Sequence, residues 1–272
     1  GSDKTGGIAG KCEILQSSGS EIEIVDCGNY ASISGCDYVG GIIGAGFSLP
    51  INIAGCTNKS DVTAQGDYAG GIAGYMSSGD SEGGAVSGTA AVTDSYNLGE
   101  IVSLCVPAPD TDTGSMTPKG YYIGGIVGRA MLGELKIVNC YNSGMIRGAE
   151  DGTEEIGALA GYTTANVENC YYRDIMTSVY GKAVSHIRLR SNEMVQLLGD
   201  SYQKNTGYPL LDWEEPEISE EEQITISFRT ADGDASITWT EAKNSSVQLP
   251  ANPYGGDVWK CDSKEYKPGD YY

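Results

Sequence analysis

The chain has 272 residues, with 37 acidic against 17 basic side chains and a formal net charge of -20 at pH 7. A surface of this charge repels nucleic acid and anionic membranes, so binding to either is not expected. Glycine contributes 39 residues and tyrosine 18, but phenylalanine only 2, which favours an all-β fold of turns and tyrosine-bearing strands. No apolar run reaches the roughly 20 residues of a membrane-spanning helix, so we expect no membrane insertion of this segment.

A glycine-rich motif recurs through the first part of the chain. It reads Tyr-Val-Gly-Gly-Ile-Ile-Gly at 38–44. Variants of it stand at 6–10, 68–74, 122–128 and 156–161. A phosphate-binding loop occurs once and opens a helix, whereas a recurring motif is typical of stacked repeats. We therefore predict one strand per repeat here, with Val39 and Ile43 on one face and Ile42 on the other.

Each repeat contains a second shared element, Cys-x-Asn or a relative of it. Its copies begin at Cys27, Cys56, Ser95, Cys140 and Cys170. A third, short extended piece follows, as at 61–64 and 100–103. Three short strands joined by corners suit a β-solenoid of about five coils, stacked about 4.8 Å apart.

The cysteines fall in register from coil to coil, so we expect an inward ladder of small, buried, reduced thiols. Neighbouring rungs are also close enough for a disulfide, which leaves Cys27 with Cys56, or Cys140 with Cys170, as an alternative. A zinc site is not expected, because no two cysteines stand two to four residues apart and His186 is the sole histidine. No cofactor or metal site is predicted.

Two more rows of side chains are in register. Asn29, Asn58, Asn97 and Asn142 are expected to hydrogen-bond along the axis and to hold a corner turn. Tyr38, Tyr68 and Tyr122 are predicted to stack along one edge. Mutual packing is the simpler interpretation of this row, and binding of sugar faces by exposed rings is the alternative.

Two insertions, at 76–90 and 104–120, are predicted to be protruding loops. Insertions in repeat proteins often fall on the face used for contact, which makes both loops candidates for specificity, although simple surface decoration is the alternative. Residues 110–114 read Asp-Thr-Asp-Thr-Gly but lack the later glutamate of a calcium loop, so no calcium site is expected.

The repeat pattern stops at Arg173. Residues 191–202 predict a helix with Ser191 as its N-cap and Gly199 near its end. We expect this helix to cap the last open coil, and residues 207–213 to close a first domain over 1–213.

An acidic segment at 214–222 predicts an extended linker. Beyond it, residues 223–229 and 236–240 alternate apolar and polar side chains around a turn at 231–234. This pattern predicts a hairpin and a small β domain over 223–272.

The motif at 38–44, together with Asn-Cys-Tyr-Asn-Ser-Gly-Met-Ile-Arg-Gly at 139–148, resembles the GLUG-motif repeats of bacterial cell-surface proteins. The resemblance covers about residues 5–175, with the array ending near 213. Residues 223–272 resemble one β-grasp module of the Listeria and Bacteroides surface-repeat type, through Trp259 and Tyr-Lys-Pro-Gly at 266–269. The resemblance implies an extracytoplasmic protein with an adhesin-like or stalk role and no catalytic residues.

We therefore expect a non-enzymatic, extracellular segment of a bacterial cell-surface protein, monomeric within a longer chain. Its expected role is adhesion or presentation of binding elements, with a host glycan or an extracellular-matrix protein as partner. A β-helical carbohydrate-active enzyme, lyase or hydrolase, is the first alternative, but no acid repeats in register as part of a groove, and paired carboxylates would be needed for hydrolysis. A passive stalk or spacer is the second alternative.

Overall fold

The computed structural model describes residues 3–14, 21–47, 50–77, 89–104, 122–131, 134–148, 155–233, 236–256, 258–261 and 264–272. Most of both predicted contact loops, 76–90 and 104–120, lies outside these residues. The chain divides into two compact units, Gly1–Ala183 and Val184–Tyr272. Within the described residues, no helix is both long and apolar enough to cross a bilayer.

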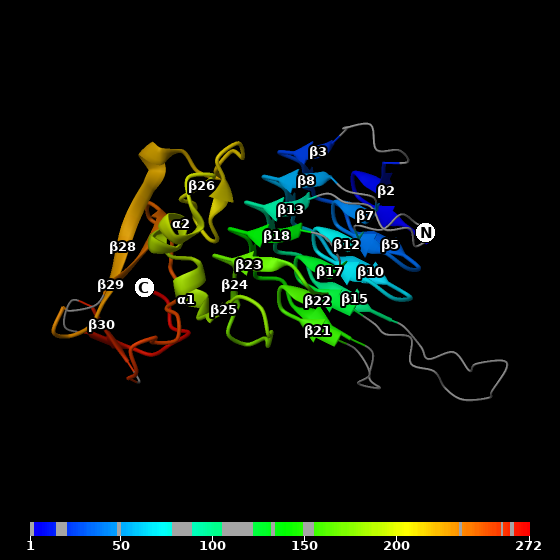
Figure 1. Ribbon diagram of the computed structural model, residues 1–272. Helices are drawn as coiled ribbons and strands as arrows, with labels where there is room; N and C mark the ends of the chain where they lie inside the picture. Colours follow the sequence, from blue (N-terminus) through cyan, green and yellow to red (C-terminus); the bar gives the residue numbers. More distant parts are fainter. Residues whose placement is uncertain are drawn as a thin grey trace, which may run out of the picture. The chain divides into compact units, whose positions relative to one another are not determined.

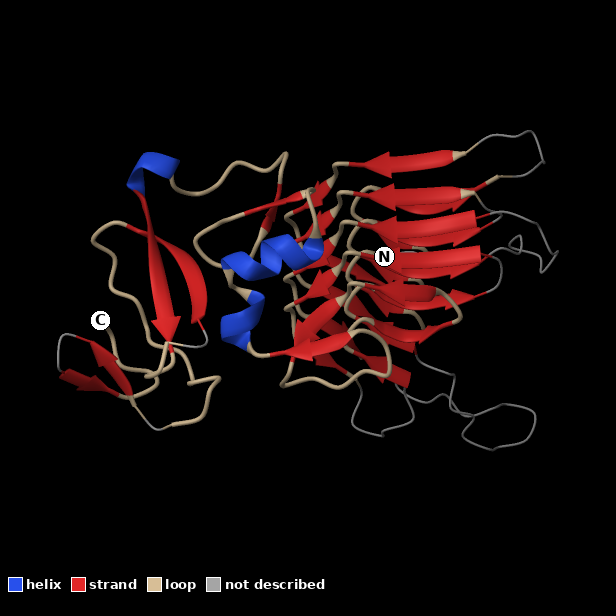
Figure 2. Ribbon diagram, turned by 60° about the vertical axis from the view of Figure 1, so that its left-hand side comes forward, coloured by secondary structure: helices blue, strands red, loops and turns tan. Residues whose placement is uncertain are grey.

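The first unit is a β-solenoid, which confirms the predicted all-β solenoid fold (Figure 1). Parallel pairing joins the strands of each coil to those of the next, and Figure 2 shows the strands of each sheet stacked one above another. A full coil has five β segments rather than the three predicted, and these build five sheets, named A to E in chain order.

The strands of the five sheets have the following bounds. Sheet A contains β1 (Thr5–Gly6), β6 (Val39–Gly40), β11 (Ala69–Gly70), β16 (Tyr122–Gly124) and β21 (Glu155–Gly157). Sheet B contains β2 (Ala9–Glu13), β7 (Ile43–Phe47), β12 (Ala73–Ser77), β17 (Val127–Met131) and β22 (Ala160–Thr163). Sheet C contains β3 (Ile22–Val25), β8 (Ile51–Ala54), β13 (Thr89–Thr93), β18 (Glu134–Val138) and β23 (Asn166–Glu168). Sheet D contains β4 (Gly28–Asn29), β9 (Thr57–Asn58), β14 (Tyr96–Asn97), β19 (Tyr141–Asn142), β24 (Tyr171–Arg173) and β25 (Lys182–Val184), and sheet E contains β5 (Ile33–Gly35), β10 (Val62–Ala64), β15 (Ile101–Ser103) and β20 (Ile146–Arg147).

The glycine motif is a corner rather than a single strand. The chain bends between β6 and β7, so Val39 packs in a small core with side chains of sheet E, while Ile42 and Ile43 both enter the main core. The predicted alternation of Ile42 and Ile43 on opposite faces is therefore wrong. At Gly40 a Cβ atom would overlap the Ile43 carbonyl oxygen, so close backbone approach explains this glycine.

The asparagine row forms a continuous buried ladder. The Asn29 side-chain amide donates to Asn58 Oδ1 at 2.7 Å, Asn58 donates to Asn97 at 2.7 Å, and Asn97 donates to Asn142 at 2.8 Å. Each amide also donates to a carbonyl two residues ahead, as Asn97 does to Gly99 at 2.8 Å. One side chain per coil thus holds its own corner and fixes the register of the next coil.

The cysteine row consists of free thiols, which lie inside the solenoid except for Cys27 in the first coil, which is only half-buried and departs from the predicted ladder. Cys56, Cys140 and Cys170 are buried, and every cysteine that the structure describes is unbridged. Each of these thiols donates to backbone carbonyls, as Cys56 Sγ does to Ile24 O at 3.4 Å. Burial raises the pKa of the Cys56 thiol to about 12, so it stays protonated and unreactive at neutral pH.

Maleimide labelling checks this arrangement. In the folded protein we expect slow modification of Cys56, Cys140 and Cys170, because each thiol is buried and the thiolate is the nucleophile. The less buried Cys36 and Cys261 should react sooner and serve as internal controls. Rapid labelling of all these thiols without denaturant would contradict a buried ladder.

The second unit combines two hairpins with two short helices. The helices are α1 (His186–Leu189) and α2 (Asn192–Leu198), followed by β26 (Tyr202–Gln203), β27 (Leu210–Leu211) and a 3-10 turn at Glu220–Glu222. The antiparallel hairpins are β28 (Gln223–Arg229) with β29 (Ser236–Ala242), and β30 (Trp259–Cys261) with β31 (Lys264–Tyr266). Their apolar core contains Ile187, Phe228, Ile237, Trp239, Val247, Leu249 and Trp259.

Helix α2 begins as predicted, with the Ser191 hydroxyl accepting from the Met194 N–H at 3.2 Å. It ends at Leu198, earlier than the predicted residue 202, because Gly199 has a φ of 110° and β26 follows. The helix contacts β29, where the Thr238 hydroxyl donates to the Glu193 carboxylate at 2.8 Å.

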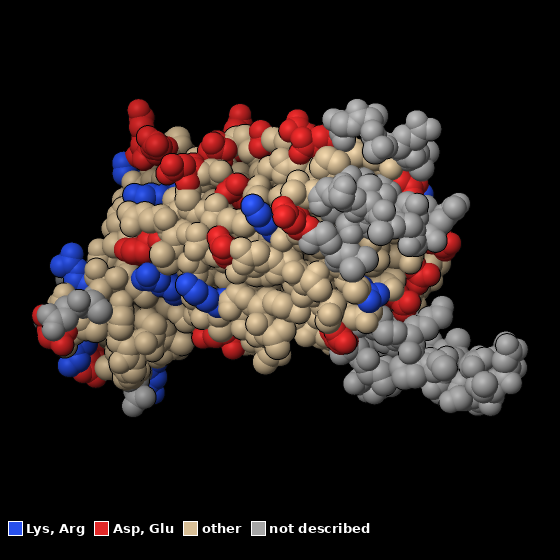
Figure 3. All heavy atoms as spheres, in the orientation of Figure 1, with Lys and Arg blue, Asp and Glu red and all other residues tan. Residues whose placement is uncertain are grey.

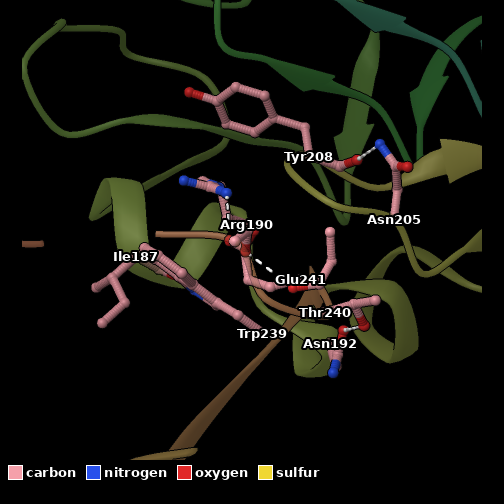
Figure 4. A network of polar contacts seen from close by, with 10 residues as sticks. Ile187, Arg190, Asn192, Asn205, Tyr208, Trp239, Thr240 and Glu241 are labelled. Atoms are coloured by element: carbon pink, nitrogen blue, oxygen red, sulfur yellow. Dashed lines mark hydrogen bonds and ion pairs between the residues drawn. The ribbon is translucent and has the colours of Figure 1, made fainter. Parts of the chain in front are cut away.

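These contacts explain why the division of the chain differs from the predicted one. Thr240 donates to Asn192 Oδ1 at 3.0 Å and the Trp239 indole donates to the Ile187 carbonyl at 2.9 Å, as Figure 4 shows. Arg190 pairs with Glu241 at 2.9 Å beside them. The helices thus join the C-terminal module, and the compact unit begins at Val184 rather than beyond the acidic segment 214–222. The roles of α2 as a solenoid cap and of 223–272 as a β-grasp module stay predictions.

Candidate functional site

Two neighbouring rows of side chains run along the solenoid where sheets A and B meet. Pairing of Thr5, Val39, Ala69, Ile123 and Ile156 puts the residues before them in register, and these form the first row: Lys4, Tyr38, Tyr68, Tyr122 and Glu155. The second row lies in sheet B and contains Lys11, Ala45, Tyr75, Arg129 and Tyr162. We call Tyr38, Tyr68, Tyr75, Tyr122, Tyr162 and Arg129 the tyrosine strip.

The rings of the tyrosine strip pack on one another. Tyr38 and Tyr68 stack with centroids 4.7 Å apart, and Tyr68 and Tyr122 stack at 5.7 Å with an interplanar angle of 3°. Tyr75 meets Tyr68 edge-on at 5.1 Å, and Tyr162 meets Tyr122 edge-on at 6.0 Å. The predicted stacking of the first row is confirmed, and the faces of these rings are largely occupied by their neighbours.

Cations complete the strip. The Arg129 guanidinium lies 4.4 Å from the Tyr122 ring centroid and 5.9 Å from those of Tyr68 and Tyr162. It also donates to the Tyr68 hydroxyl at 3.3 Å. Lys4 lies 5.0 Å from the Tyr38 centroid, at the other end of the first row. Each such contact contributes about 0.5–1 kcal/mol at an exposed site.

Two tyrosines of the first row have a strained backbone. Tyr38 has a φ of 50° and Tyr68 a φ of 48°, in the left-handed region that bulky side chains rarely occupy. Strain of this kind costs about 1–3 kcal/mol per residue and is found preferentially at binding and active sites. Stacking between coils therefore holds these rings in positions that the local backbone would not choose.

The environment of the strip keeps the Tyr38 and Tyr68 hydroxyls protonated. Burial, followed by the neighbouring Tyr68, Tyr75, Asp37 and Asp67, raises the pKa of Tyr38 to about 12. Burial also raises the pKa of Tyr68, although the Arg129 hydrogen bond opposes this shift. At neutral pH both phenols can therefore donate as well as accept hydrogen bonds.

Alkaline titration tests this environment. The pKa of Tyr38 is higher in the folded chain than the value of about 10 in an unfolded one, so its stabilising contribution is complete below about pH 10 and is lost as the pH rises through about 12. We expect the free energy of unfolding, measured in urea, to fall over this range. Tyr38→Phe cannot ionise and should show a shallower fall, while an unchanged pH dependence would contradict the shift.

Half of the strip was not predicted from the sequence. Tyr75, Arg129 and Tyr162 follow the first-row positions Tyr68, Tyr122 and Glu155 by seven residues each, but in the second row only Tyr75 and Tyr162 share a residue type. The fixed offset of seven residues was the available signal. The chain bends at the glycine motif, and this bend brings the two residues of each coil that are seven apart side by side. In a straight strand they would lie far from each other.

Other parts of the described solenoid offer less chemistry. A pocket of about 410 Å³ beside β21 and β22 contains Glu155 as its one carboxylate, whereas glycoside hydrolysis uses a pair. Acidic side chains are spread over several separate places on the face shown in Figure 3. No group of three or more potential metal ligands occurs among the described residues.

Comparisons with protein-family models, with curated proteins and with solved structures find no match for this chain. The site is therefore interpreted from its own geometry.

Proposed function

We propose that this chain is a non-enzymatic, extracellular segment of a bacterial cell-surface protein, and that its tyrosine strip binds a neutral glycan. The observation that carries the proposal is the stacked row of Tyr38, Tyr68 and Tyr122, strained at Tyr38 and Tyr68, with Arg129 alongside. The resemblance to GLUG-motif repeats supports the cell-surface location and the adhesive role.

The strip offers what an extended oligosaccharide requires. Tyrosines present an apolar body with a polar tip, and protonated phenols and a guanidinium can hydrogen-bond sugar hydroxyls. The ring-to-ring spacing of 4.7 to 5.7 Å is close to the length of one pyranose unit, so a glycan laid along the axis would meet similar groups at each step. Because ring faces are covered within the row, contact would come from ring edges and hydroxyls.

Charge favours a neutral ligand over an anionic one. The chain has a net charge of -20, and Asp37 and Asp67 lie close enough to Tyr38 to influence its pKa. Carboxylates accept hydrogen bonds from sugar hydroxyls but repel uronic or sialic acids. Binding of a neutral glycan should therefore depend little on the salt concentration.

A binding measurement with neutral and acidic oligosaccharides tests the proposal, using chitohexaose, cellohexaose and a uronate oligomer as first probes. We expect a neutral oligomer to bind, and Tyr75→Ala to weaken binding on the order of tenfold, as loss of about 1.4 kcal/mol would. Tyr30→Ala is the matched control, because Tyr30 is 62% exposed and lies outside the strip. Absence of any neutral glycan binding, or equal affinity of the two variants, would contradict it.

A passive spacer is the second candidate, favoured by the mutual packing of the rings. Stacked aromatic pairs contribute about 0.5–1.5 kcal/mol each, so the strip would stabilise a stalk without any ligand. In that case Tyr75→Ala lowers the melting temperature and the wild-type protein binds no oligosaccharide.

A further inference from the structure

A small, partly polar pocket lies within the C-terminal unit. It encloses about 260 Å³ and is lined by residues of α1, of β29 and of the chain from 246 to 250. Pockets for drug-sized ligands enclose about 300–1,000 Å³, so this pocket suits a smaller molecule.

Arg190 and Glu241 line this pocket as a preformed pair. Arg190 Nη2 donates to Glu241 Oε1 at 2.9 Å, and the guanidinium lies 4.3 Å from the Trp239 ring centroid (Figure 4). Trp239 is 1% exposed and its indole donates to the Ile187 carbonyl at 2.9 Å, so the ring that supports the guanidinium is itself fixed. The pair is therefore held in place before any ligand arrives, which lowers the entropic cost of binding.

Both members of the pair keep unused hydrogen-bonding capacity. A guanidinium carries several N–H donors, and a carboxylate has two acceptor oxygens. The bond between them uses Nη2 and Oε1, while Arg190 Nη1 and Glu241 Oε2 have no hydrogen-bond partner among the described residues. The two side chains are 22% and 14% exposed, so a ligand can reach them. The pocket thus offers a donor and an acceptor next to each other.

Most of the remaining wall is apolar or aromatic. Val247 and Leu249 are buried, and Tyr271 lines the pocket with 65% of its surface exposed. His186 lines it as well, with its ring centroid 6.5 Å from that of Trp239. A few fixed polar groups in a largely apolar wall are the usual composition of a small-molecule site.

We propose that this pocket binds one neutral sugar unit, with Arg190 donating to one hydroxyl and Glu241 accepting from the next. The charges of the pair cancel, so an anionic ligand is repelled by Glu241 and a cationic ligand by Arg190. Sugar hydroxyls both donate and accept, so two adjacent hydroxyls satisfy both members of the pair. The C–H face of the sugar would then lie against the apolar wall, with the Tyr271 ring at its side.

This sugar site is independent of the proposed strip binding. It belongs to the C-terminal unit, whereas the tyrosine strip belongs to the solenoid. A single sugar unit bound here should keep its affinity in Tyr75→Ala, which alters the strip alone. The failure of either proposal therefore leaves the other standing.

Titration of the labelled full chain with glucose, galactose, mannose and N-acetylglucosamine tests the pocket, with the Trp239 indole N–H resonance as reporter. We expect at least one of these neutral sugars to bind with a Kd on the order of 1 mM. The uronate and the amino sugar that match it should bind at least about tenfold more weakly. No saturable shift with any of the four sugars, or tighter binding of a charged analogue, would overturn the proposal.

Glu241→Gln tests the role of the pair. The glutamine oxygen can still accept from Arg190, but an amide donor replaces the free acceptor, so the Kd should rise about tenfold. Glu265→Gln is the matched control, because Glu265 pairs with Lys260 at 3.1 Å and neither residue lines this pocket. Wild-type affinity in Glu241→Gln, or an equal loss in Glu265→Gln, would overturn the assignment.

Tyr271→Ala provides a second test that leaves the pair intact. The Tyr271 side chain is largely exposed, so its removal should change the melting temperature little and raise the Kd about threefold. If Glu241→Gln fails to fold, Tyr271→Ala decides, and wild-type affinity in that variant would overturn the site.

Discussion

Replacing Asn97 by alanine should lower the free energy of unfolding by about 3 kcal/mol or more. Asn97 accepts from Asn58 at 2.7 Å and donates to Asn142 at 2.8 Å and to Gly99 at 2.8 Å, so its loss leaves several buried groups without these partners. Each such group costs about 1–3 kcal/mol. Urea unfolding followed by circular dichroism measures the change.

Asn52→Ala is the matched control for this prediction. Asn52 lies in β8 on the half-buried side of sheet C, away from the ladder, and its replacement should change the free energy of unfolding by less than about 0.5 kcal/mol. Equal effects of the two substitutions would mean that the ladder does not hold the coils together.

Gly70→Ala should destabilise the fold at least as much as Asn97→Ala. We expect it to lower the free energy of unfolding by about 3 kcal/mol or more and to reduce the yield of folded protein. A Cβ atom at this position would overlap the Ala73 carbonyl oxygen and come within 2.7 Å of the Gly128 nitrogen, and neither backbone atom can move without separating coils. The equivalent positions in the other coils are all glycine: Gly6, Gly40, Gly124 and Gly157.

Gly46→Ala is the control from the same coil stack. The nearest atom to its Cβ would be the end of the Ile51 side chain, at 2.9 Å, and alanine already occupies the equivalent position at Ala130. We expect Gly46→Ala to change the free energy of unfolding by about 1 kcal/mol or less. The melting temperatures of the two variants check this difference. A Gly46→Ala protein that is as unstable as Gly70→Ala would contradict the prediction.

Features that repeat in every coil could be predicted from the sequence. The asparagine and cysteine rows share a residue type and a spacing, so their register, and hence the solenoid, follows from alignment of the chain with itself. The corner before each cysteine shows the limit of this approach. Asp26, Gly55, Asp94, Asn139 and Asn169 all have a positive φ, but the residue type varies because several small polar residues tolerate that conformation.

Features that depend on how the coil bends were missed. The bend at Gly41 separates sheet A from sheet B, turning one predicted strand into two and sending Ile42 and Ile43 into the same core. The second row of the tyrosine strip depends on this bend. Assignment of α2 to the C-terminal module likewise depends on side-chain pairs far apart in sequence, such as Glu193 with Thr238.

The most direct test of the proposed function is to follow the tyrosine ring resonances by NMR while a neutral hexasaccharide is added to the labelled full chain. We predict that the shifts are concentrated at Tyr38, Tyr68, Tyr75, Tyr122 and Tyr162, that Tyr30 stays unchanged, and that the pattern is the same in low and high salt. Shifts that leave the tyrosine strip unchanged, or binding that vanishes in salt, would contradict the assignment of the strip as a neutral-glycan site.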